Sequence, residues 1–122
     1  MLEVLLGSKN AERVLQFILA RNSAYAREIA LFYDVSPSVI KKQLEKFEIG
    51  NIIVGRNVGN IRIYELNQRN SLIKELTALL LKARSNYEPD ERARLVRKDR
   101  SRPRSKNKPL IQRRDNIQDI QK

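Results

Sequence analysis

The chain has 122 residues, enough for one small domain with a tail but too few for two full domains. Its net charge of +11 and its pI of about 10.3 favour a polyanionic partner, with nucleic acid ahead of an anionic membrane surface. The absence of Cys and His excludes thiol nucleophiles, disulfides, zinc fingers and imidazole bases.

The start of the chain shows no secretion signal, because MLEVLLG lacks a basic beginning and a long apolar stretch. No apolar run in the sequence is long enough to span a bilayer. We therefore expect a soluble, cytoplasmic protein that does not enter a membrane.

The first predicted elements are apolar. MLEVLLG is too short for a helix that is stable alone, so we expect it to pack on another surface, with a partner subunit as one candidate. A helical pattern then runs from Lys9 to Arg21, and Ser8 is placed to cap its first turn. After the break at NSA, a second helix is predicted from Ala26 to Phe32 or Tyr33.

A tight turn and a third helix follow. Asp34 lies in the connection, where such turns often need a positive φ that Asp tolerates better than most residues. Ser36 is predicted to cap the third helix and Pro37 to occupy its first position, where no hydrogen bond is lost. The apolar residues recur with a helical period at Ile40, Leu44 and Phe47. The opposite side carries Ser38, Lys42 and Glu45, flanked by Val39, Lys41 and Lys46.

The apolar period changes to two after residue 51. NIIVGR and NIRIYEL are separated by NVG, so residues 52–66 are predicted to form a hairpin with Gly59 and Asn60 in its turn. Ser71 is then predicted to cap a fourth helix. The apolar stripe of that helix comprises Leu72, Ile73, Leu76, Leu79, Leu80 and Ala83.

The composition shifts at Glu88. Residues 92–108 contain nine basic residues and one acid, a run that repels itself and buries little apolar surface. We expect disorder there, or helix only as far as about Lys98. The predicted organisation is a folded domain over residues 1–87 and a basic tail over residues 88–122.

A set of residues spread over roughly residues 1–83 accompanies these elements. It comprises Gly7-Ser8-Lys9, Arg13, Val14-Leu15, Tyr25, Arg27-Glu28-Ile29-Ala30, Ser36-Pro37-Ser38, Leu44, Phe47, Gly59, Arg62, Tyr64 and Asn67. With the order helix, helix, turn, helix, hairpin and helix, this set resembles the winged helix-turn-helix domain of the ArsR/MarR-like superfamily of bacterial and archaeal regulators. The closer resemblance is to small winged-helix domains fused to, or encoded near, nucleotidyltransferase-like proteins.

The resemblance implies a fold that is mainly α with a small β-hairpin (α+β), a winged helix-turn-helix with flanking dimerisation helices. Two positions depart from the usual pattern. Asp34 stands where Gly is usual in the turn, and Gly50-Asn51 stands where Ala-Gly usually ends the third helix, although Asn can adopt the left-handed conformation required there. Metal and thiol sensing cannot be carried over without Cys or His, so we expect no metal and no cofactor.

Gly7-Ser8 also resembles the opening of a nucleotidyltransferase active site. That chemistry needs an Asp-x-Asp pair a short way downstream to hold magnesium, and no such pair follows. We therefore expect no enzymatic activity and interpret Ser8 as a helix cap.

The resemblance places the third helix in the major groove of double-stranded DNA and the hairpin, or wing, on a minor groove or the backbone. The predicted contacts of the helix are Ser36, Ser38, Val39, Lys41, Lys42 and Lys46. The predicted contacts of the wing are Arg56, Asn57, Asn60 and Arg62, with a structural role in the strand as the alternative for Arg62. Arg27 is a predicted phosphate contact, with an ion pair to Glu28 as its alternative.

The apolar stripe of the fourth helix could simply be core. Dimerisation is the favoured alternative, because the stripe and MLEVLLG together would leave a small monomer with a large exposed patch. The predicted dimer contacts are Leu2, Leu5, Leu72, Leu76, Leu79 and Leu80. The expected function is sequence-specific transcriptional regulation, by a repressor that binds an inverted repeat as a homodimer.

Three roles of the basic tail stay open: an arm on DNA, an RNA-binding segment, or a docking segment for a protein partner. The arm is the simplest, because neutralising phosphates requires no fold. Its predicted residues are Arg97, Lys98, Arg100, Arg102 and Arg104. The alternative function is an antitoxin-like or accessory interaction protein of a toxin, nucleotidyltransferase or mobile-element system, whose tail docks a partner.

Overall fold

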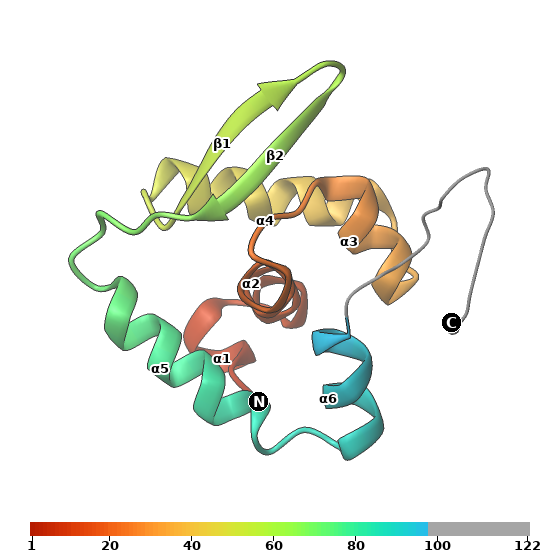
Figure 1. Cartoon of the computed structure of the whole chain (residues 1–122), viewed down its shortest axis with the longest axis vertical. Coiled ribbons are helices and arrows are strands. Elements are labelled where there is room, and N and C mark those ends of the chain that lie inside the picture. The colour runs from red at the N-terminus through yellow and green to blue at the C-terminus, as the bar shows by residue number, and fades with distance from the viewer. Residues whose placement is uncertain (98–122) are drawn as a thin grey trace, which may run out of the picture.

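A computed structural model describes residues 1–97 of the chain (Figure 1). In chain order the elements are α1 (Glu3–Leu6), α2 (Lys9–Arg21), α3 (Ala26–Tyr33), α4 (Pro37–Ile49), β1 (Ile53–Val58), β2 (Ile61–Leu66), α5 (Ile73–Arg84) and α6 (Pro89–Val96). The predicted α+β class, mainly helical with one hairpin, is confirmed, and the element order is that of a winged helix-turn-helix. No helix within residues 1–97 is long and apolar enough to cross a membrane.

Helix α2 forms the centre of the molecule. Figure 1 views it end-on, with the other helices and the hairpin around it, and it contacts α1, α3, α4, β2, α5 and α6. Its N-terminus is capped as predicted, because Ser8 Oγ accepts the Ala11 N–H at 3.0 Å. The largest fully buried side chains include Phe17, Leu15 and Ile18 from this helix. Burial on most sides of α2 therefore places the hydrophobic core along its length.

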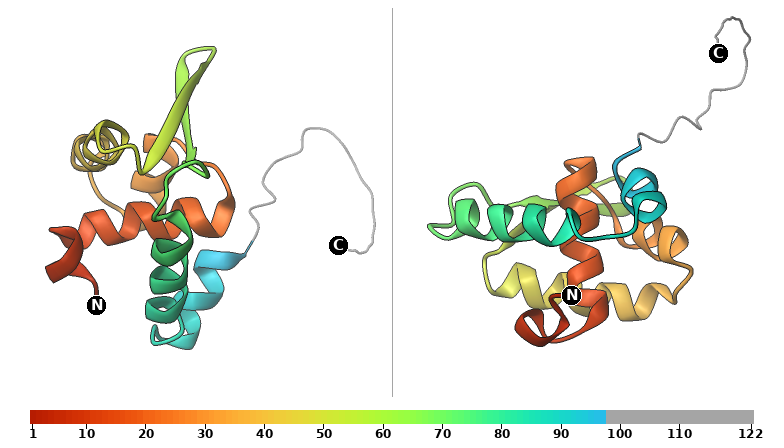
Figure 2. Two further views of the ribbon diagram at one scale, coloured as in Figure 1. Left: turned by 90° about the vertical axis from the view of Figure 1, so that its left-hand side faces the viewer. Right: turned by 90° about the horizontal axis from the view of Figure 1, so that it is seen from below.

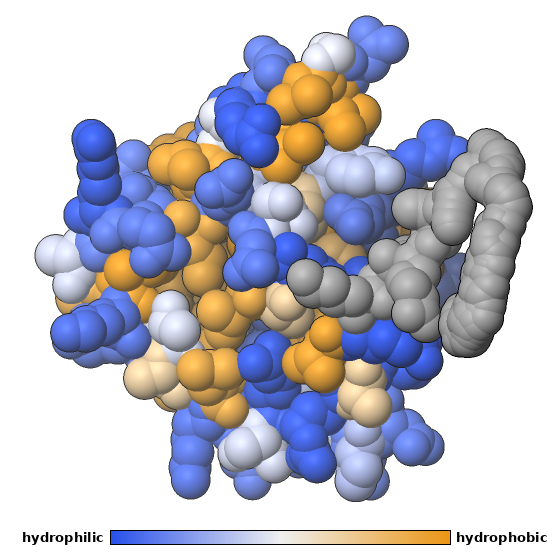
Figure 3. All heavy atoms as spheres, viewed as in Figure 1, coloured by the Kyte–Doolittle hydropathy of each residue, from blue (hydrophilic) through white to orange (hydrophobic). Residues whose placement is uncertain are grey.

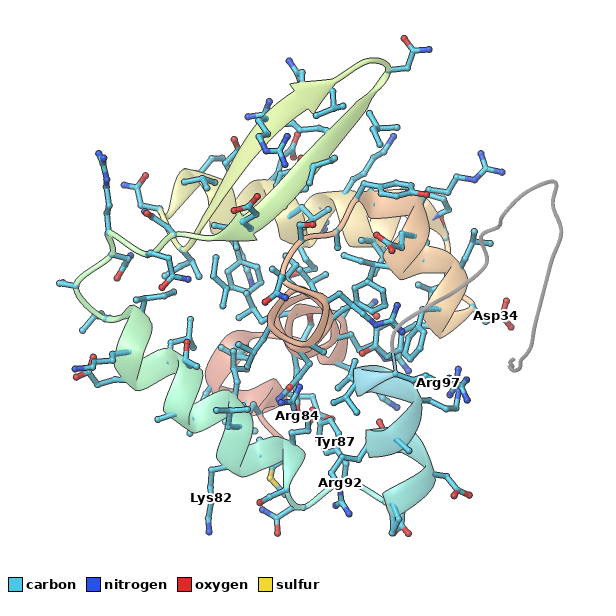
Figure 4. The ribbon with its side chains drawn as sticks, in the orientation of Figure 1. Asp34, Lys82, Arg84, Tyr87, Arg92 and Arg97 are labelled. Atoms are coloured by element: carbon cyan, nitrogen blue, oxygen red, sulfur yellow. The ribbon has the colours of Figure 1, made fainter. Side chains whose placement is uncertain are left out.

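The turn between α3 and α4 has the conformation expected from the sequence. Asp34 ends α3 in the left-handed region with φ of 56° and ψ of 52°, and its N–H donates to the carbonyls of Ala30 and Leu31. Ser36 then caps α4, its Oγ accepting the Ser38 N–H at 3.2 Å, and Pro37 is the first helical residue. Figure 4 shows Asp34 at the exposed end of α3. The predicted helix-turn-helix is thus confirmed at its caps and its turn.

The hairpin is antiparallel, with Ile53 opposite Leu66 and Val58 opposite Ile61. Gly59 turns the chain at the tip with φ of 60°. At the base, Ala24 forms a bridge with Tyr64 and so ties β2 to the segment after α2. The left panel of Figure 2 shows the hairpin projecting from the body beside α4, as a wing does.

The cap of α5 differs from the prediction. Ser71 makes no side-chain cap, and α5 begins at Ile73. Asn70 Oδ1 instead accepts the Leu72 N–H at 2.8 Å, while Asn70 Nδ2 donates to the Asn51 carbonyl at 2.9 Å. Asn70 therefore joins the start of α5 to the end of α4, a contact between distant segments that local sequence could not indicate. Asn51 has φ of 63°, the left-handed conformation expected of it.

The folded part of the chain extends beyond the predicted boundary at residue 87. Helix α6 covers residues that the sequence assigned to the tail, and Leu95 is 1% exposed against α2. Arg21 Nε donates to the Leu95 carbonyl at 3.0 Å and so caps the end of α6. The helix itself agrees with the expected alternative of helix as far as about Lys98. Its packing on α2 has no local signal in the sequence, because Leu95 and Val96 lie within a basic run. The rest of the expected tail, residues 98–122, lies outside the described residues.

The apolar stripe of α5 divides into two parts. Leu80 is fully buried in the core of the same chain, and Leu2 is buried there with 6% of its surface exposed, so these two predicted dimer contacts are corrected to core residues. Leu76 is half-buried against that core. Leu72 and Leu79 are exposed, and Figure 3 shows apolar surface over α5 on the face in view. This surface, with exposed Leu5 on α1, remains free for contact with a partner.

Candidate nucleic-acid interface

Helix α4 has one buried and one exposed side, as its periodicity predicts. Ile40 and Leu44 are fully buried against the core, while Ser38, Lys41, Lys42 and Glu45 are exposed. Val39 is 37% exposed at the edge of that surface. The residues predicted to read bases therefore share the solvent side of one helix.

The N-terminal end of α4 is fixed by its own side chains. Ser36 Oγ lies 2.8 Å from Ser38 Oγ, in addition to accepting the Ser38 N–H. Both hydroxyls are exposed, as is Pro37. The helix dipole places partial positive charge at this end, and both hydroxyls can donate or accept a hydrogen bond, so this end favours an anionic oxygen.

Lys41 and Lys42 are exposed cations on the first half of α4. Within residues 1–97 the structure records no ion pair and no side-chain hydrogen bond for either lysine, although it records ion pairs elsewhere. Arg27 is exposed on the first turn of α3, at the opposite end of that helix from Asp34. Cations with no protein partner are available to neutralise phosphates or to donate to base edges.

Lys46, the last predicted contact of α4, has a role in the fold that the sequence did not indicate. Its Nζ donates to the Leu6 carbonyl at 2.9 Å and lies 5.0 Å from the centre of the Phe47 ring. The ammonium group thereby satisfies a carbonyl at the end of α1 and holds α1 against α4. Lys46 lies toward the other end of α4 from Ser36, away from Lys41 and Lys42 along the chain.

The wing presents its predicted residues in two ways. Arg56 and Asn60 are exposed. Arg56 forms a solvent-exposed ion pair across the strands, with its Nη2 3.5 Å from Glu65 Oε2. Such a surface pair is weak, so Arg56 stays available to a stronger anionic partner. Asn57 is also exposed near the tip, where its Oδ1 accepts a hydrogen bond from Arg62 at 3.0 Å.

Arg62 points toward α4. Its Nη2 donates to Glu48 Oε2 in a short charge-assisted hydrogen bond, and its Nε lies 3.4 Å from Glu48 Oε1. The Glu48 carboxylate raises the pKa of Arg62 above its usual value. Its guanidinium group is therefore engaged by the protein, in agreement with the structural alternative weighed for this residue.

Of the five residues predicted for the basic tail, the described part of the chain includes Arg97. Arg97 is exposed directly after α6, and Figure 4 shows it on the α3 side of the molecule. Lys98, Arg100, Arg102 and Arg104 lie outside the described residues.

Two polar residues inside α2, which the sequence did not single out, belong to the core and not to this surface. Glu12 is 4% exposed, and its carboxylate accepts the Leu2 N–H at 2.6 Å, the Met1 amino group at 3.1 Å and the Tyr87 hydroxyl. Burial and the neighbouring Glu12 raise the pKa of Tyr87 well above its usual value. Gln16 Nε2 donates to the Leu80 carbonyl at 2.8 Å. These bonds fasten the chain start, α5 and the α5–α6 junction to α2.

The sequence matches no protein-family model, and no curated protein matches it either. Among solved structures, it is similar to a double mutant of ZitR from Lactococcus lactis in its apo form. The identity is 18% and the TM-score 0.48, over 68% of this chain and 71% of that one. A second structure of the mutant gives 16% identity and a TM-score of 0.45, over 66% of this chain and 63% of that one. Since both TM-scores lie below 0.5, the winged helix-turn-helix assignment rests on the chain's own elements.

Proposed function

We propose that this protein is a sequence-specific DNA-binding transcriptional regulator of the ArsR/MarR-like kind, with α4 as its recognition helix. The observation that carries the proposal is the pair Lys41 and Lys42, exposed and unpaired within residues 1–97, on a capped helix that follows a tight turn and precedes a wing. Ile40 and Leu44 hold α4 on the core from its buried side. The opposite side, with its cations, can therefore enter a major groove while the helix stays packed on the domain.

Each part of the surface has a distinct task in this proposal. Ser38, Val39, Lys41 and Lys42 approach base edges, while the exposed Ser36 hydroxyl and the exposed Arg27 hold phosphates. Arg56, Asn57 and Asn60 bring the wing to the adjacent minor groove or its backbone, where the narrow groove favours cations.

We further propose a homodimer that binds an inverted repeat and acts as a repressor. The exposed Leu5, Leu72 and Leu79 support a partner surface on α1 and α5, and a second copy of this chain is the occupant we propose. Two recognition helices related by a two-fold axis predict half-sites about 10 base pairs apart, centre to centre.

The test begins with selection of bound duplexes from a random double-stranded library, followed by fluorescence anisotropy against a selected duplex and a scrambled one. Lys41→Ala with Lys42→Ala should weaken binding to the selected duplex at least tenfold, about 1.4 kcal/mol, and reduce discrimination between the duplexes. Lys74→Ala with Lys82→Ala is the matched control, because it removes the same charge from exposed positions of α5, and Lys82 points away from the body in Figure 4. Equal losses for the two pairs would overturn the recognition-helix assignment.

A further inference from the structure

Arg62 links the wing to the recognition helix. It lies on the hairpin face that also carries Gly55, Asn57 and Tyr64, because residues 55 and 57 pair with residues 64 and 62. From that face its guanidinium group reaches Glu48 on α4, donates to Asn57 on β1 and lies 5.8 Å from the centre of the Tyr64 ring. One side chain therefore connects both strands with the helix.

Gly55 provides the space that this connection needs. A Cβ atom at Gly55 would lie 2.7 Å from Arg62 Nε and 3.0 Å from its Cζ, closer than non-bonded atoms approach. The positive-φ glycines of the described chain are Gly7 and Gly59, so Gly55 is not required by its backbone conformation. Its missing side chain instead lets the guanidinium group cross the strand and reach Glu48.

The connection lies where the hairpin has little other support. The base is held by the two hydrogen bonds between Ala24 and Tyr64, whereas Val58, Gly59 and Ile61 near the tip are exposed. A two-stranded hairpin alone is marginally stable, so its outer half is free to twist and bend unless a side chain fixes it. Arg62, which pairs with Asn57 one step from the tip pair, acts on that outer half.

We propose that Gly55, Arg62 and Glu48 form a brace that fixes the angle between the wing and α4, with Arg62 as a positioning residue and not a DNA contact. The brace itself is a property of the free protein, while its effect on DNA binding rests on the function proposed above. By holding the wing at a set angle before binding, the brace reduces the ordering that a complex with DNA requires.

Distance measurement in the free protein tests the brace directly. Because the chain has no Cys, Lys41→Cys and Asn60→Cys place two spin labels, one on α4 and one at the wing tip, for double electron–electron resonance. The doubly labelled parent should give one narrow distance distribution. Gly55→Ala and Glu48→Gln, each added to that parent, should broaden it.

The matched control is Gly50→Ala, which adds the same methyl group at φ of −81°, where its nearest neighbour would be 3.5 Å away. The control should keep the narrow distribution. A Gly55→Ala distribution as narrow as that of Gly50→Ala would overturn the brace, and so would a parent that is already broad.

Exchanging the charges of Arg62 and Glu48 and measuring DNA binding then shows whether Arg62 positions the wing or contacts DNA itself. Arg62→Glu should weaken binding to the selected duplex about tenfold, and adding Glu48→Arg should restore most of that loss, because the ion pair reforms with reversed charges. Arg62→Gln should leave the slope of log K against log salt unchanged. A slope shallower by about 0.9, with no rescue by the exchange, would instead assign Arg62 to a phosphate.

The spin-label distances and the DNA-binding measurements test the brace and the proposed function independently. If the wild-type protein bound no duplex, the proposed function would fall, and the spin-label distances alone would still decide whether the brace exists.

Discussion

Replacing Leu95 tests whether α6 belongs to the folded domain. Its side chain is 1% exposed, and a buried Leu→Ala change lowers stability by about 2–5 kcal/mol. Because α6 ends the described chain, it can detach from α2 without unfolding the rest of the domain. The stability lost on Leu95→Ala therefore cannot exceed the free energy with which α6 packs on the domain. That docking also includes the Arg21 bond to the Leu95 carbonyl and the Arg94 guanidinium group, 4.7 Å from the centre of the Phe32 ring.

We therefore expect Leu95→Ala to lower the free energy of unfolding by about 1–3 kcal/mol and the Tm by about 5–20 °C. Urea titration and thermal melting followed by circular dichroism measure both. Val96→Ala is the control, because Val96 is the next residue and is 45% exposed. Truncation after Tyr87 should destabilise at least as much as Leu95→Ala, whereas truncation after Arg97 should not. If the Leu95→Ala protein had the same Tm as the Val96→Ala control, the packing of α6 on the domain would be refuted.

Three further outcomes follow from the same structure. Leu72→Glu with Leu79→Glu should give a folded monomer in light scattering, and a folded dimer would place the dimer contact elsewhere. Ser36→Ala should lower the free energy of unfolding by about 1 kcal/mol in urea titration, whereas Ser71→Ala, which removes no cap, should have little effect; equal effects would contradict the capping account. Truncation after Arg97 should weaken binding to selected and random DNA by similar factors and make the salt dependence shallower by several contacts. An unchanged slope would favour a protein partner for the tail.

The helix-turn-helix was predictable because its signals are local. Ser8, Asp34 and Ser36 act within their own turns, through a side chain or a backbone angle, and the structure has each of them in the expected role. The alternation of the hairpin and its Gly59 turn are likewise properties of neighbouring residues. Local signals of this kind give the bounds of α2, α3 and α4 without knowledge of the tertiary structure.

The missed features depend on residues far apart in the sequence. Lys46 meets the Leu6 carbonyl 40 positions away, and Arg21 meets the Leu95 carbonyl 74 positions away. Arg62 could be recognised as structural only once Glu48 was placed beneath it. In each case the sequence identifies a cation, but a cation that binds DNA and a cation that fastens the fold have the same local pattern.

Amide chemical-shift mapping of the ¹⁵N-labelled protein with a selected duplex shows directly whether α4 and the wing contact DNA. The largest changes should occur at Ser38 to Lys42 of α4 and at Arg56 to Asn60 of the wing. Residues in the second half of α5 should shift little, because that helix lies apart from α4 in the left panel of Figure 2. Changes concentrated on α5 or α6, with α4 and the wing unaffected, would rule out DNA binding through α4 and the wing.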